Sequence, residues 1–343
     1  MMSVMIGIDP HKGSHTAVVI NSDEVVIDAI RVRASAGQLA ELQEWAAGYP
    51  ERCWAVESAR GLGHLLSQQL VGAGERVLDV PAMMASRVRV LGSGKSQKND
   101  PNDARSVAIT ALRHSGLKTV TADDHPRVLG LLAKRHRDVA RLKNKAACRL
   151  HALLAELKAG GLASEMTVNK AVSMLSSVEV TDEVMRQRIM IATELIEDIA
   201  RFDTQLKASK KRITTAVTAS GTGLCDITVI GPIGAATILG SVGDINRFPT
   251  KGHFASYNAT APIEASSGNN NRHRLNPRGN RKLNHVLHVA AVCQLRYPGQ
   301  GRLYYDKKLA EGKTSKEAIR ALKRRISDAI YRQLRTDAPN TIN

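Results

Sequence analysis

Apolar residues in the first 80 positions alternate between short runs and helical spacing. Three short apolar runs are separated by turn residues, at positions 4–9, 16–20 and 25–32. Residues 37–48 and 62–71 have helical spacing, and they alternate with short apolar runs at 53–56 and 76–80. Runs bounded by turn residues predict strands, and apolar steps of three and four predict helices. We therefore expect an antiparallel meander of three strands, followed by alternating strands and helices.

This order of elements is typical of a ribonuclease-H-like domain. The pattern changes after residue 125, where apolar positions from Val128 to Leu157 step by three, four or seven until Gly160-Gly161. A second stretch of similar spacing runs from Met185 to Ile213. Two long amphipathic helices predict either an antiparallel pair within one chain or a coiled coil between chains. The spacing leaves both arrangements open.

The last third of the chain predicts a mainly helical domain. Residues 224–236 favour a helix-hairpin-helix, in which the Gly231-x-x-Gly234 turn leads into a helix near Ala235. Backbone amides at such a turn bind DNA phosphate, although the same residues would also serve to join two core helices. A loop or short hairpin is expected at 262–284, and helices are expected at 285–295 and 316–334. The predicted domains are therefore 1–125, 126–217 and 218–343.

The charge of the chain indicates a polyanionic partner. The 343 residues carry 49 Lys and Arg against 32 Asp and Glu, which gives a net charge of +17. The three predicted domains carry net charges of −1, +7 and +11, so the excess lies in the last two and suits phosphate backbone. Aromatic residues make up only 3%, which argues against a stacking platform for single-stranded bases.

Neither a long apolar run nor a signal-peptide pattern is evident, so we expect no membrane association and a cytoplasmic location. The four cysteines are too far apart in sequence for a metal knuckle and are expected to be reduced and buried.

Four acidic residues fall where the predicted elements would bring them together. Asp9 ends the first strand, Glu57 ends the fourth, and Asp100 and Asp103 open a helix. The first and fourth strands are neighbours in a ribonuclease-H-like sheet, so the four carboxylates would surround one pocket. Clustered carboxylates bind hard divalent cations, which predicts one or two Mg²⁺ ions for phosphoryl transfer. The alternative is a helix cap and two solvated acids with no joint role.

Residues 92–96, Gly-Ser-Gly-Lys-Ser, resemble the end of a phosphate-binding loop. The full pattern requires glycine five residues before Gly94, where this chain has Arg89, and no apolar strand leads into the segment. We therefore expect a basic loop in which Lys95 and Lys98 contact nucleic acid. His285 and His288 lack partner ligands in the sequence and are expected on a helix surface, and Tyr304 and Tyr305 are expected to be packing residues.

Taken together, several motifs resemble the DEDD transposases of insertion-sequence family one-hundred-and-ten, described as bridge-RNA-guided recombinases. The resemblance covers nearly the whole chain and rests on five motifs in order: Gly7-Ile8-Asp9, Val56-Glu57, Lys98-x-Asp100-x-x-Asp103-Ala104, Ile230-Gly231-Pro232-Ile233-Gly234 and Pro262-x-x-x-x-Ser267-Gly268. It implies a Holliday-junction-resolvase-like N-terminal domain, a coiled-coil middle and a C-terminal transposase domain.

The same resemblance implies a function and a second set of site residues. Asp9, Glu57, Asp100 and Asp103 would bind Mg²⁺, and Ser267 would attack a DNA phosphate to form a covalent phosphoserine intermediate. A structured noncoding RNA would pair with target and donor DNA, and the sites would assemble in a dimer or tetramer. The protein would act in the bacterial cytoplasm, in association with the nucleoid. The chain departs from the family at Ala259-Thr260-Ala261-Pro262, which lacks the usual glycine, and Ser266 beside Ser267 is an alternative nucleophile.

Chemistry at this serine needs positive charge near the phosphate, because a pentacoordinate phosphorus carries additional negative charge. The candidate side chains are Arg272, Arg274, Arg278 and Arg281. Without the resemblance, Ser266-Ser267-Gly268 would be interpreted as a polar turn.

Three other functions remain open from the sequence. A metal-dependent Holliday-junction nuclease without a covalent step would need only the carboxylates. A DNA-binding architectural protein would need neither site. A kinase of the actin-like superfold also begins with a Gly-Ile-Asp strand, but it gives no reason for the basic last third.

Overall fold

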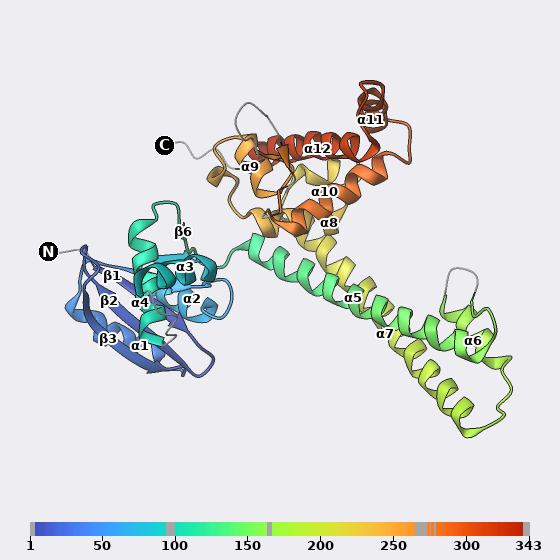
Figure 1. Cartoon of the computed structure of the whole chain (residues 1–343), viewed down its shortest axis with the longest axis horizontal. Coiled ribbons are helices and arrows are strands. Elements are labelled where there is room, and N and C mark those ends of the chain that lie inside the picture. Colours follow the sequence, from blue (N-terminus) through green and yellow to red (C-terminus); the bar gives the residue numbers. More distant parts are fainter. Residues whose placement is uncertain are drawn as a thin grey trace. The chain divides into compact units, whose positions relative to one another are not determined.

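The computed structural model describes residues 4–93, 100–162, 167–264, 273–274, 276–277 and 279–338 (Figure 1). The chain divides into two compact units, Met1–Asp123 and Asp124–Asn343. The three-domain division remains a prediction.

The first unit is built on a six-stranded mixed sheet. Its strands are β1 (Val4–Pro10), β2 (Ser14–Ile20), β3 (Val26–Arg33), β4 (Arg52–Glu57), β5 (Val77–Val80) and β6 (Lys118–Thr119), in the spatial order β3-β2-β1-β4-β5-β6. The first three strands are antiparallel, β4 is parallel to β1, and β5 is parallel to β4. This is the meander followed by parallel strands that is expected for a ribonuclease-H-like domain, and it makes β1 and β4 neighbours.

Helices cover both faces of this sheet. They are α1 (Gln38–Trp45), which leads into the 3-10 turn η1 (Ala46–Gly48), α2 (His64–Gly72), α3 (Ala82–Ser93) and α4 (Asp100–Arg113). Ile6 and Ile8 of β1 are completely buried in the cluster that contains Leu42 of α1 and Leu70 of α2. Val18 of β2 packs in another cluster with residues of α4. Because successive strand residues point to opposite faces, β1 contributes to both layers.

Helix α3 was not predicted from the sequence. It extends over Gly92 and Ser93, which were expected in a loop. Since a helix and not a strand leads into the Gly-Ser-Gly-Lys-Ser segment, the rejection of a phosphate-binding loop stands. Lys95 and Lys98 lie outside the described residues.

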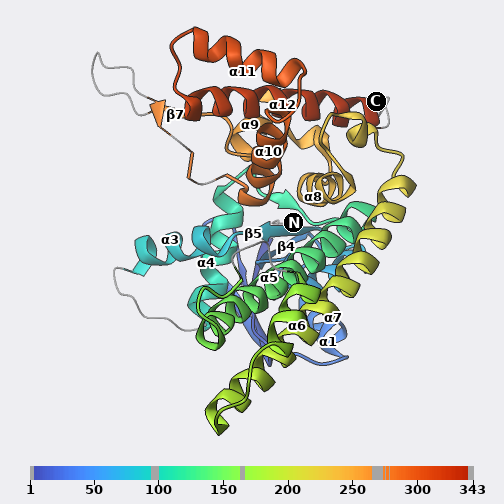
Figure 2. The ribbon, with the colours of Figure 1, turned by 90° about the vertical axis from the view of Figure 1, so that its right-hand side faces the viewer.

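The second unit begins with a long helical hairpin. Helices α5 (His125–Leu157) and α7 (Glu183–Ala219) lie side by side, and the short α6 (Val168–Ser176), which was not predicted, packs at their far end (Figures 1 and 2). Arg135 Nη2 donates to Gln205 Oε1 at 3.2 Å, and Arg188 Nε donates to Glu156 Oε2 at 3.0 Å, so the two helices run antiparallel. The predicted long helices therefore pair within the chain. A coiled coil between chains remains a prediction.

The rest of this unit is mainly helical, as predicted. It comprises η2 (Gly223–Asp226), α8 (Pro232–Val242), η3 (Ile245–Arg247), α9 (Lys251–Tyr257), β7 (Ile263–Glu264), β8 (His273–Arg274), α10 (Arg281–Gln294), α11 (Gln300–Ala310) and α12 (Ser315–Asp337). Their apolar side chains share one core with the adjoining ends of α5 and α7. At the crossing of α5 and α8, a Cβ on Gly240 would lie 2.3 Å from Gly130 Cα, so these two helices approach closely because both residues are glycine.

The segment predicted as a helix-hairpin-helix folds differently. Only the four-residue 3-10 turn η2 precedes Gly231, and Gly231 is the N-cap of α8. Helix α8 begins at Pro232, a residue favoured at the first helical position, so Gly234 lies inside its first turn. The helix-hairpin-helix is not confirmed.

Two smaller expectations can also be compared with the structure. Among the described helices, none combines the length and apolar character needed to cross a membrane. All four cysteines are free, but only Cys53 is buried, while Cys148 and Cys225 are exposed. Because these two side chains lie on the surface of the second unit, the expectation that all four are buried was wrong.

Candidate active site

Strand alternation places two of the predicted carboxylates on the same face of the sheet. Gly7 of β1 is paired with Ala55 of the parallel strand β4, and Ile8 with Val56. Asp9 and Glu57 follow on the two neighbouring strands at the same level, and side chains at every second position share a face. Both point toward the α4 side, because Ile6 and Ile8 fill the opposite layer.

Helix α4 supplies the other two carboxylates from its first turn, Asp100 and Asp103. The helix packs directly on β1 at Gly7, where a Cβ would lie 2.1 Å from the carbonyl oxygen of Ala104 and 2.8 Å from the Cβ of Ala108. A side chain at position 7 would therefore push the helix away from the strand. Gly7 is thus the residue that lets Asp103 approach Asp9.

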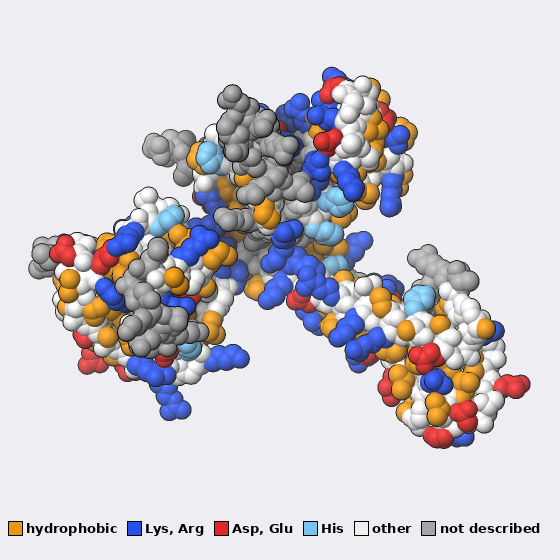
Figure 3. Space-filling model, in the orientation of Figure 1, with side chains coloured by type: hydrophobic (Ala, Val, Ile, Leu, Met, Phe, Trp, Pro, Cys, Tyr) orange, Lys and Arg blue, Asp and Glu red, His pale blue; other side chains and the backbone are white. Residues whose placement is uncertain are grey.

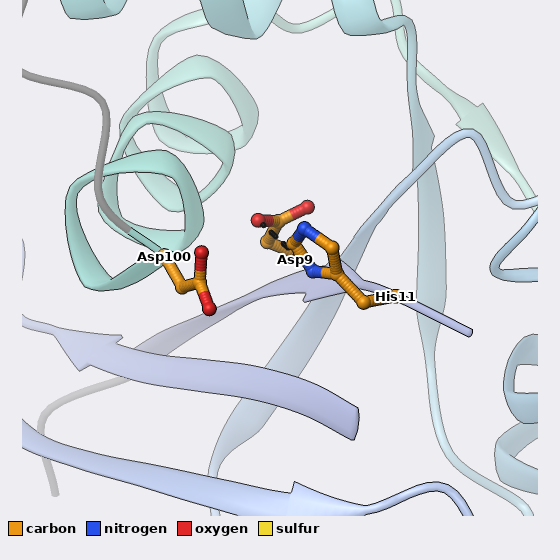
Figure 4. A group of neighbouring side chains, drawn as sticks. All are labelled: Asp9, His11 and Asp100. Atoms are coloured by element: carbon orange, nitrogen blue, oxygen red, sulfur yellow. Dashed lines mark ion pairs between the residues drawn. The ribbon is translucent and has the colours of Figure 1, made fainter. Parts of the chain in front are cut away.

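The carboxylates of Asp9, Glu57 and Asp103 line one cavity of about 360 Å³. Asp100 lies at its margin, where ligand atoms of Asp9, His11 and Asp100 are within 4.8 Å of one another (Figure 4). Its carboxylate also lies 3.6 Å from Arg31 Nη2. The predicted convergence of the four carboxylates is therefore observed, with three in the cavity and one at its edge.

The local electrostatics are those of crowded acids in a partly dry site. Asp9 is only 6% exposed. Burial raises the pKa of Asp9, and the neighbouring Asp103 and Asp100 carboxylates raise it further, while His11 opposes them. Burial followed by the charge of Asp9 likewise raises the pKa of Glu57. The ionised carboxylates of this cavity therefore destabilise the folded protein, and a bound cation would remove this destabilisation.

Four polar residues that line the cavity were missed as site residues: His11, Ser86, Arg89 and Ser106. His11 Nδ1 lies 3.5 Å from Asp9 Oδ2, and Arg89 forms an ion pair with Asp103. Two of the four carried a signal in the sequence. His11 stands two residues after Asp9 and Ser106 stands three after Asp103, whereas Ser86 and Arg89 could be found only once α3 was known.

Comparison with known protein families agrees with this arrangement. Residues 222–306 match the family profile described as "Transposase IS116/IS110/IS902 family", and residues 6–158 match a DEDD transposase profile of IS110. The chain belongs to the IS110/IS116/IS902 transposase family. As a transposase, it is an enzyme that cleaves and transfers DNA strands. All four carboxylates lie inside the profile matched by residues 6–158, and both candidate serines lie inside the profile matched by residues 222–306.

Curated relatives of this transposase come from actinobacterial insertion elements. An uncharacterized 44.8 kDa protein of element IS116 from Streptomyces clavuligerus is 26% identical, and the alignment covers 97% of this chain and 94% of that protein. An uncharacterized 42 kDa protein of IS900 from Mycobacterium paratuberculosis is 24% identical, with 98% and 96% covered. An uncharacterized 43.6 kDa protein of IS110 from Streptomyces coelicolor is 36% identical over 31% of this chain and 26% of its own length.

Among solved structures, RuvC of T. thermophilus in complex with a Holliday junction substrate matches 34% of this transposase and 99% of its own chain, with 20% identity and a TM-score of 0.28. A second Thermus thermophilus RuvC structure has 17% identity and a TM-score of 0.27, with the same coverage of both chains.

The C-terminal candidates of this transposase are less completely described. Ser266, Ser267, Arg272 and Arg278 lie outside the described residues, as does the side chain of Arg274. Arg281 is exposed at the start of α10, and His285 and His288 are exposed on the same helix, as expected. Tyr304 packs against the core, also as expected, while Tyr305 donates to Ser315 Oγ at 2.9 Å.

A polar network, which we call the Asn258 frame, joins the residues before and after the serine-bearing segment. It consists of Asn258, Thr260, Asn284, Lys323 and Ser327. Asn258 is completely buried and donates to Ser327 Oγ at 2.7 Å. Asn284 Nδ2 donates to the carbonyl oxygen of Asn258 at 3.0 Å, and Asn284 Oδ1 accepts from Lys323 Nζ at 2.8 Å. Burial lowers the pKa of Lys323.

Backbone geometry at the same place is constrained. Ala259 adopts a φ of 61°, and a Cβ on Gly279 would lie 2.4 Å from the Cβ of Ala259. The amide of Asn280 donates to the carbonyl oxygen of Tyr257 at 2.7 Å. Residues 257–260 and 279–284 are therefore held against each other, and this fixes both ends of the segment that contains Ser266 and Ser267.

Proposed function

We propose that this transposase cuts and rejoins the DNA of a mobile element with two sets of residues. Asp9, Glu57, Asp100 and Asp103 form a Mg²⁺ site, and Ser267 forms a covalent phosphoserine intermediate, with Ser266 as the alternative nucleophile. The observation that carries the proposal is the convergence of four carboxylates, from two strands and one helix, on one cavity.

The donor set of the cavity fits a hard divalent cation. Its anionic ligands are carboxylate oxygens, which Mg²⁺ prefers. Burial, together with the repulsion from neighbouring carboxylates, raises the pKa values of Asp9 and Glu57. When bound, the cation would polarise a phosphoryl oxygen and promote loss of a proton from an attacking hydroxyl. Asp9, Glu57 and Asp103 would hold it inside the cavity, and Asp100 would close its margin.

In the proposed cleavage step, the serine Oγ attacks a DNA phosphorus and loses its proton. An Oγ–P bond forms while the bond from phosphorus to one deoxyribose oxygen breaks, and that oxygen leaves as a hydroxyl after taking a proton. The hydroxyl of the incoming strand then displaces the serine, which restores a phosphodiester. Arg272, Arg274, Arg278 and Arg281 would stabilise the charge on the pentacoordinate phosphate.

The Asn258 frame supports this role for the serine-bearing segment. A nucleophile accelerates a reaction only when it is held near the attacked atom, so loops that carry one benefit from fixed ends. Hydrogen bonds from Asn284 and Asn258 provide such fixation on both sides of residues 261–278.

Target and donor DNA and a structured guide RNA are the proposed partners. Basic side chains gather on α5 near the C-terminal core, whereas hydrophobic and acidic groups are common at the far end of the hairpin (Figure 3). Exposed basic residues of α5 and of the adjoining part of α7 include Lys134, Arg135, Arg141, Lys145, Arg149, Arg201, Lys207, Lys210, Lys211 and Arg212. This charge suits phosphate backbone. Lys95, Lys98, Gly231 and Gly234 are further candidates for contact, and assembly into a dimer or tetramer is proposed as well.

The proposal is tested by trapping the intermediate. Wild type, Ser267→Ala, Ser266→Ala and Asp9→Ala are each incubated with end-labelled element DNA, Mg²⁺ and RNA co-purified from a host that carries the whole element. The reaction products are then separated on a denaturing gel. A protein–DNA band that is lost in Ser267→Ala and Asp9→Ala supports the proposal, and loss in Ser266→Ala instead moves the nucleophile. Metal-dependent cleavage without any band in wild type would indicate a nuclease without a covalent step.

A further inference from the structure

Arg89 of α3 places a permanent positive charge inside the carboxylate cavity. Its guanidinium donates through Nη1 to Asp103 Oδ1. The side chain is 24% exposed and that of Asp103 is 11% exposed, so the contact is largely shielded from water. Ion pairs that are partly buried are screened less than exposed ones.

The position of Arg89 follows from the packing of α3. Helix α3 lines the cavity with Ala82, Met83, Ala85, Ser86 and Arg89. All of these except Met83 lie on one side of the helix, because they are spaced by three, four and seven residues. Ala85 is buried in the same cluster as Val107 of α4. Arg89 is thus directed into the cavity by a packed helix face and does not reach it from a free surface.

The guanidinium of Arg89 interacts electrostatically with all three carboxylates that line the cavity. The Asp103 carboxylate raises the pKa of Arg89 through a hydrogen bond and its charge, and Glu57 and Asp9 add to this effect. Arginine stays protonated at all working pH values, so the charge cannot be removed by titration. Among the described residues that line the cavity, Arg89 and His11 are the groups that can offset its carboxylates.

We propose that Arg89 is a built-in competitor for the divalent cation, which occupies Asp103 until the cation displaces it. The inference rests on the proposed metal site at the same carboxylates. An Asp103 oxygen that accepts from a guanidinium directs that lone pair away from a cation, and a positive charge nearby repels the cation in addition. Complete loading of the site therefore requires Arg89 to leave Asp103.

The experiment measures cation binding directly, without DNA and without turnover. Mg²⁺ is titrated into the full chain by calorimetry, and Mn²⁺ binding is followed by electron paramagnetic resonance, for wild type and Arg89→Gln. Because the variant loses one charge-assisted contact that opposes cation binding, Arg89→Gln is expected to bind the cation about tenfold more tightly, which corresponds to about 1.4 kcal/mol. Arg87→Gln is the matched control, because Arg87 is exposed on the same helix and its loss removes the same charge; it is expected to change affinity less than about twofold.

Unchanged or weaker binding by Arg89→Gln would overturn the inference. Should this variant be too unstable to purify, Arg89→Lys decides instead, because it keeps a charge but loses the planar, paired donors. It is expected to bind about threefold more tightly than wild type, since lysine competes less well for a carboxylate; equal or weaker binding again overturns the inference. Wild type and Asp9→Asn separate the two proposals. If wild type binds no cation, the proposed metal site is wrong. If wild type binds the cation and Asp9→Asn does not, the metal site is supported, and the effect of Arg89 can be measured on it.

Discussion

The two candidate regions of this transposase hold their polar groups in opposite ways. The cavity of the first unit brings together carboxylates whose charges repel one another, and burial raises the pKa values of Asp9 and Glu57. In the Asn258 frame of the second unit, no two like charges meet: the buried neutral side chains of Asn258 and Ser327 bond to each other, and Lys323 donates to Asn284. The first arrangement favours a ligand of opposite charge. The second fixes backbone, and needs no ligand to be stable.

The largest expected effect is a loss of DNA cleavage when a carboxylate of the cavity is replaced. Asp103→Asn removes one proposed cation ligand while keeping the shape of the side chain, so DNA strand cleavage should fall by roughly a thousandfold or more, as for loss of one member of a catalytic group. Cleavage of labelled element DNA measures this loss. Asp23→Asn is the control, because Asp23 is exposed in the turn before β3 and should leave the rate unchanged. Full activity of Asp103→Asn would contradict a role for this carboxylate.

A smaller effect should come from the contact that brings the acids together. Gly7→Ala places a Cβ against the Ala104 carbonyl, since the available separation is 2.1 Å. Displacing α4 should lower the free energy of unfolding by about 3 kcal/mol, at the upper end for overpacking. Urea denaturation measures it. Gly13→Ala is the matched control, because a Cβ there meets nothing within 4 Å, and equal stability of both variants would show that Gly7 does not limit the approach of α4.

The sequence predicted the first region better than the second, for physical reasons. Strand alternation and the three-residue spacing of Asp100 and Asp103 are local rules, so the convergence of the acids followed from the order of the elements. Arg89 escaped prediction because α3 has no strong apolar stripe: Met83 is 68% exposed and Val90 is 64% exposed. A helix of this kind is recognised by what it packs on, and not by its own pattern.

The Asn258 frame could not be predicted because its members are far apart in sequence. Asn258 and Ser327 are separated by 69 positions, and nothing about either residue indicates the other. The expected helix-hairpin-helix is not confirmed, for a related reason. Gly231 and Gly234 matched a local motif, but helix α8 begins between them at Pro232. The same spacing of glycines therefore also fits a helix start, with Gly231 as the N-cap.

The third prediction tests whether the frame acts within its own unit. Asn258→Ala leaves the hydroxyl of Ser327 and two groups of Thr260 without their partner, which should cost about 2 kcal/mol. Hydrogen exchange followed by mass spectrometry should show faster exchange in α9 and α12. Exchange in β1 and β4 should be unchanged, and the affinity for Mg²⁺ should match that of wild type. Weaker Mg²⁺ binding would contradict the separation of the two regions.

The smallest expected effect is the pH dependence of stability in metal-free protein. Asp9 and Glu57 have raised pKa values in the folded chain, against ordinary values of 3.8 and 4.5. The folded state therefore holds these protons more tightly than the unfolded state does. As the pH rises from these ordinary values through the raised folded values, the unfolded state releases its protons first, and the free energy of unfolding falls.

Asp9→Asn removes one of these acids and relieves Glu57 of its nearest charge, so its stability should depend less on pH. Urea denaturation of metal-free wild type and Asp9→Asn at pH 5 and pH 7.5 should show that the advantage of the variant grows with pH. Saturating Mg²⁺ should reverse the order, because only wild type keeps the full ligand set. An advantage that shrinks as the pH rises would mean that Asp9 is stabilised as an anion by its surroundings, and the contrast between a charge-crowded cavity and a self-satisfied frame would then not hold.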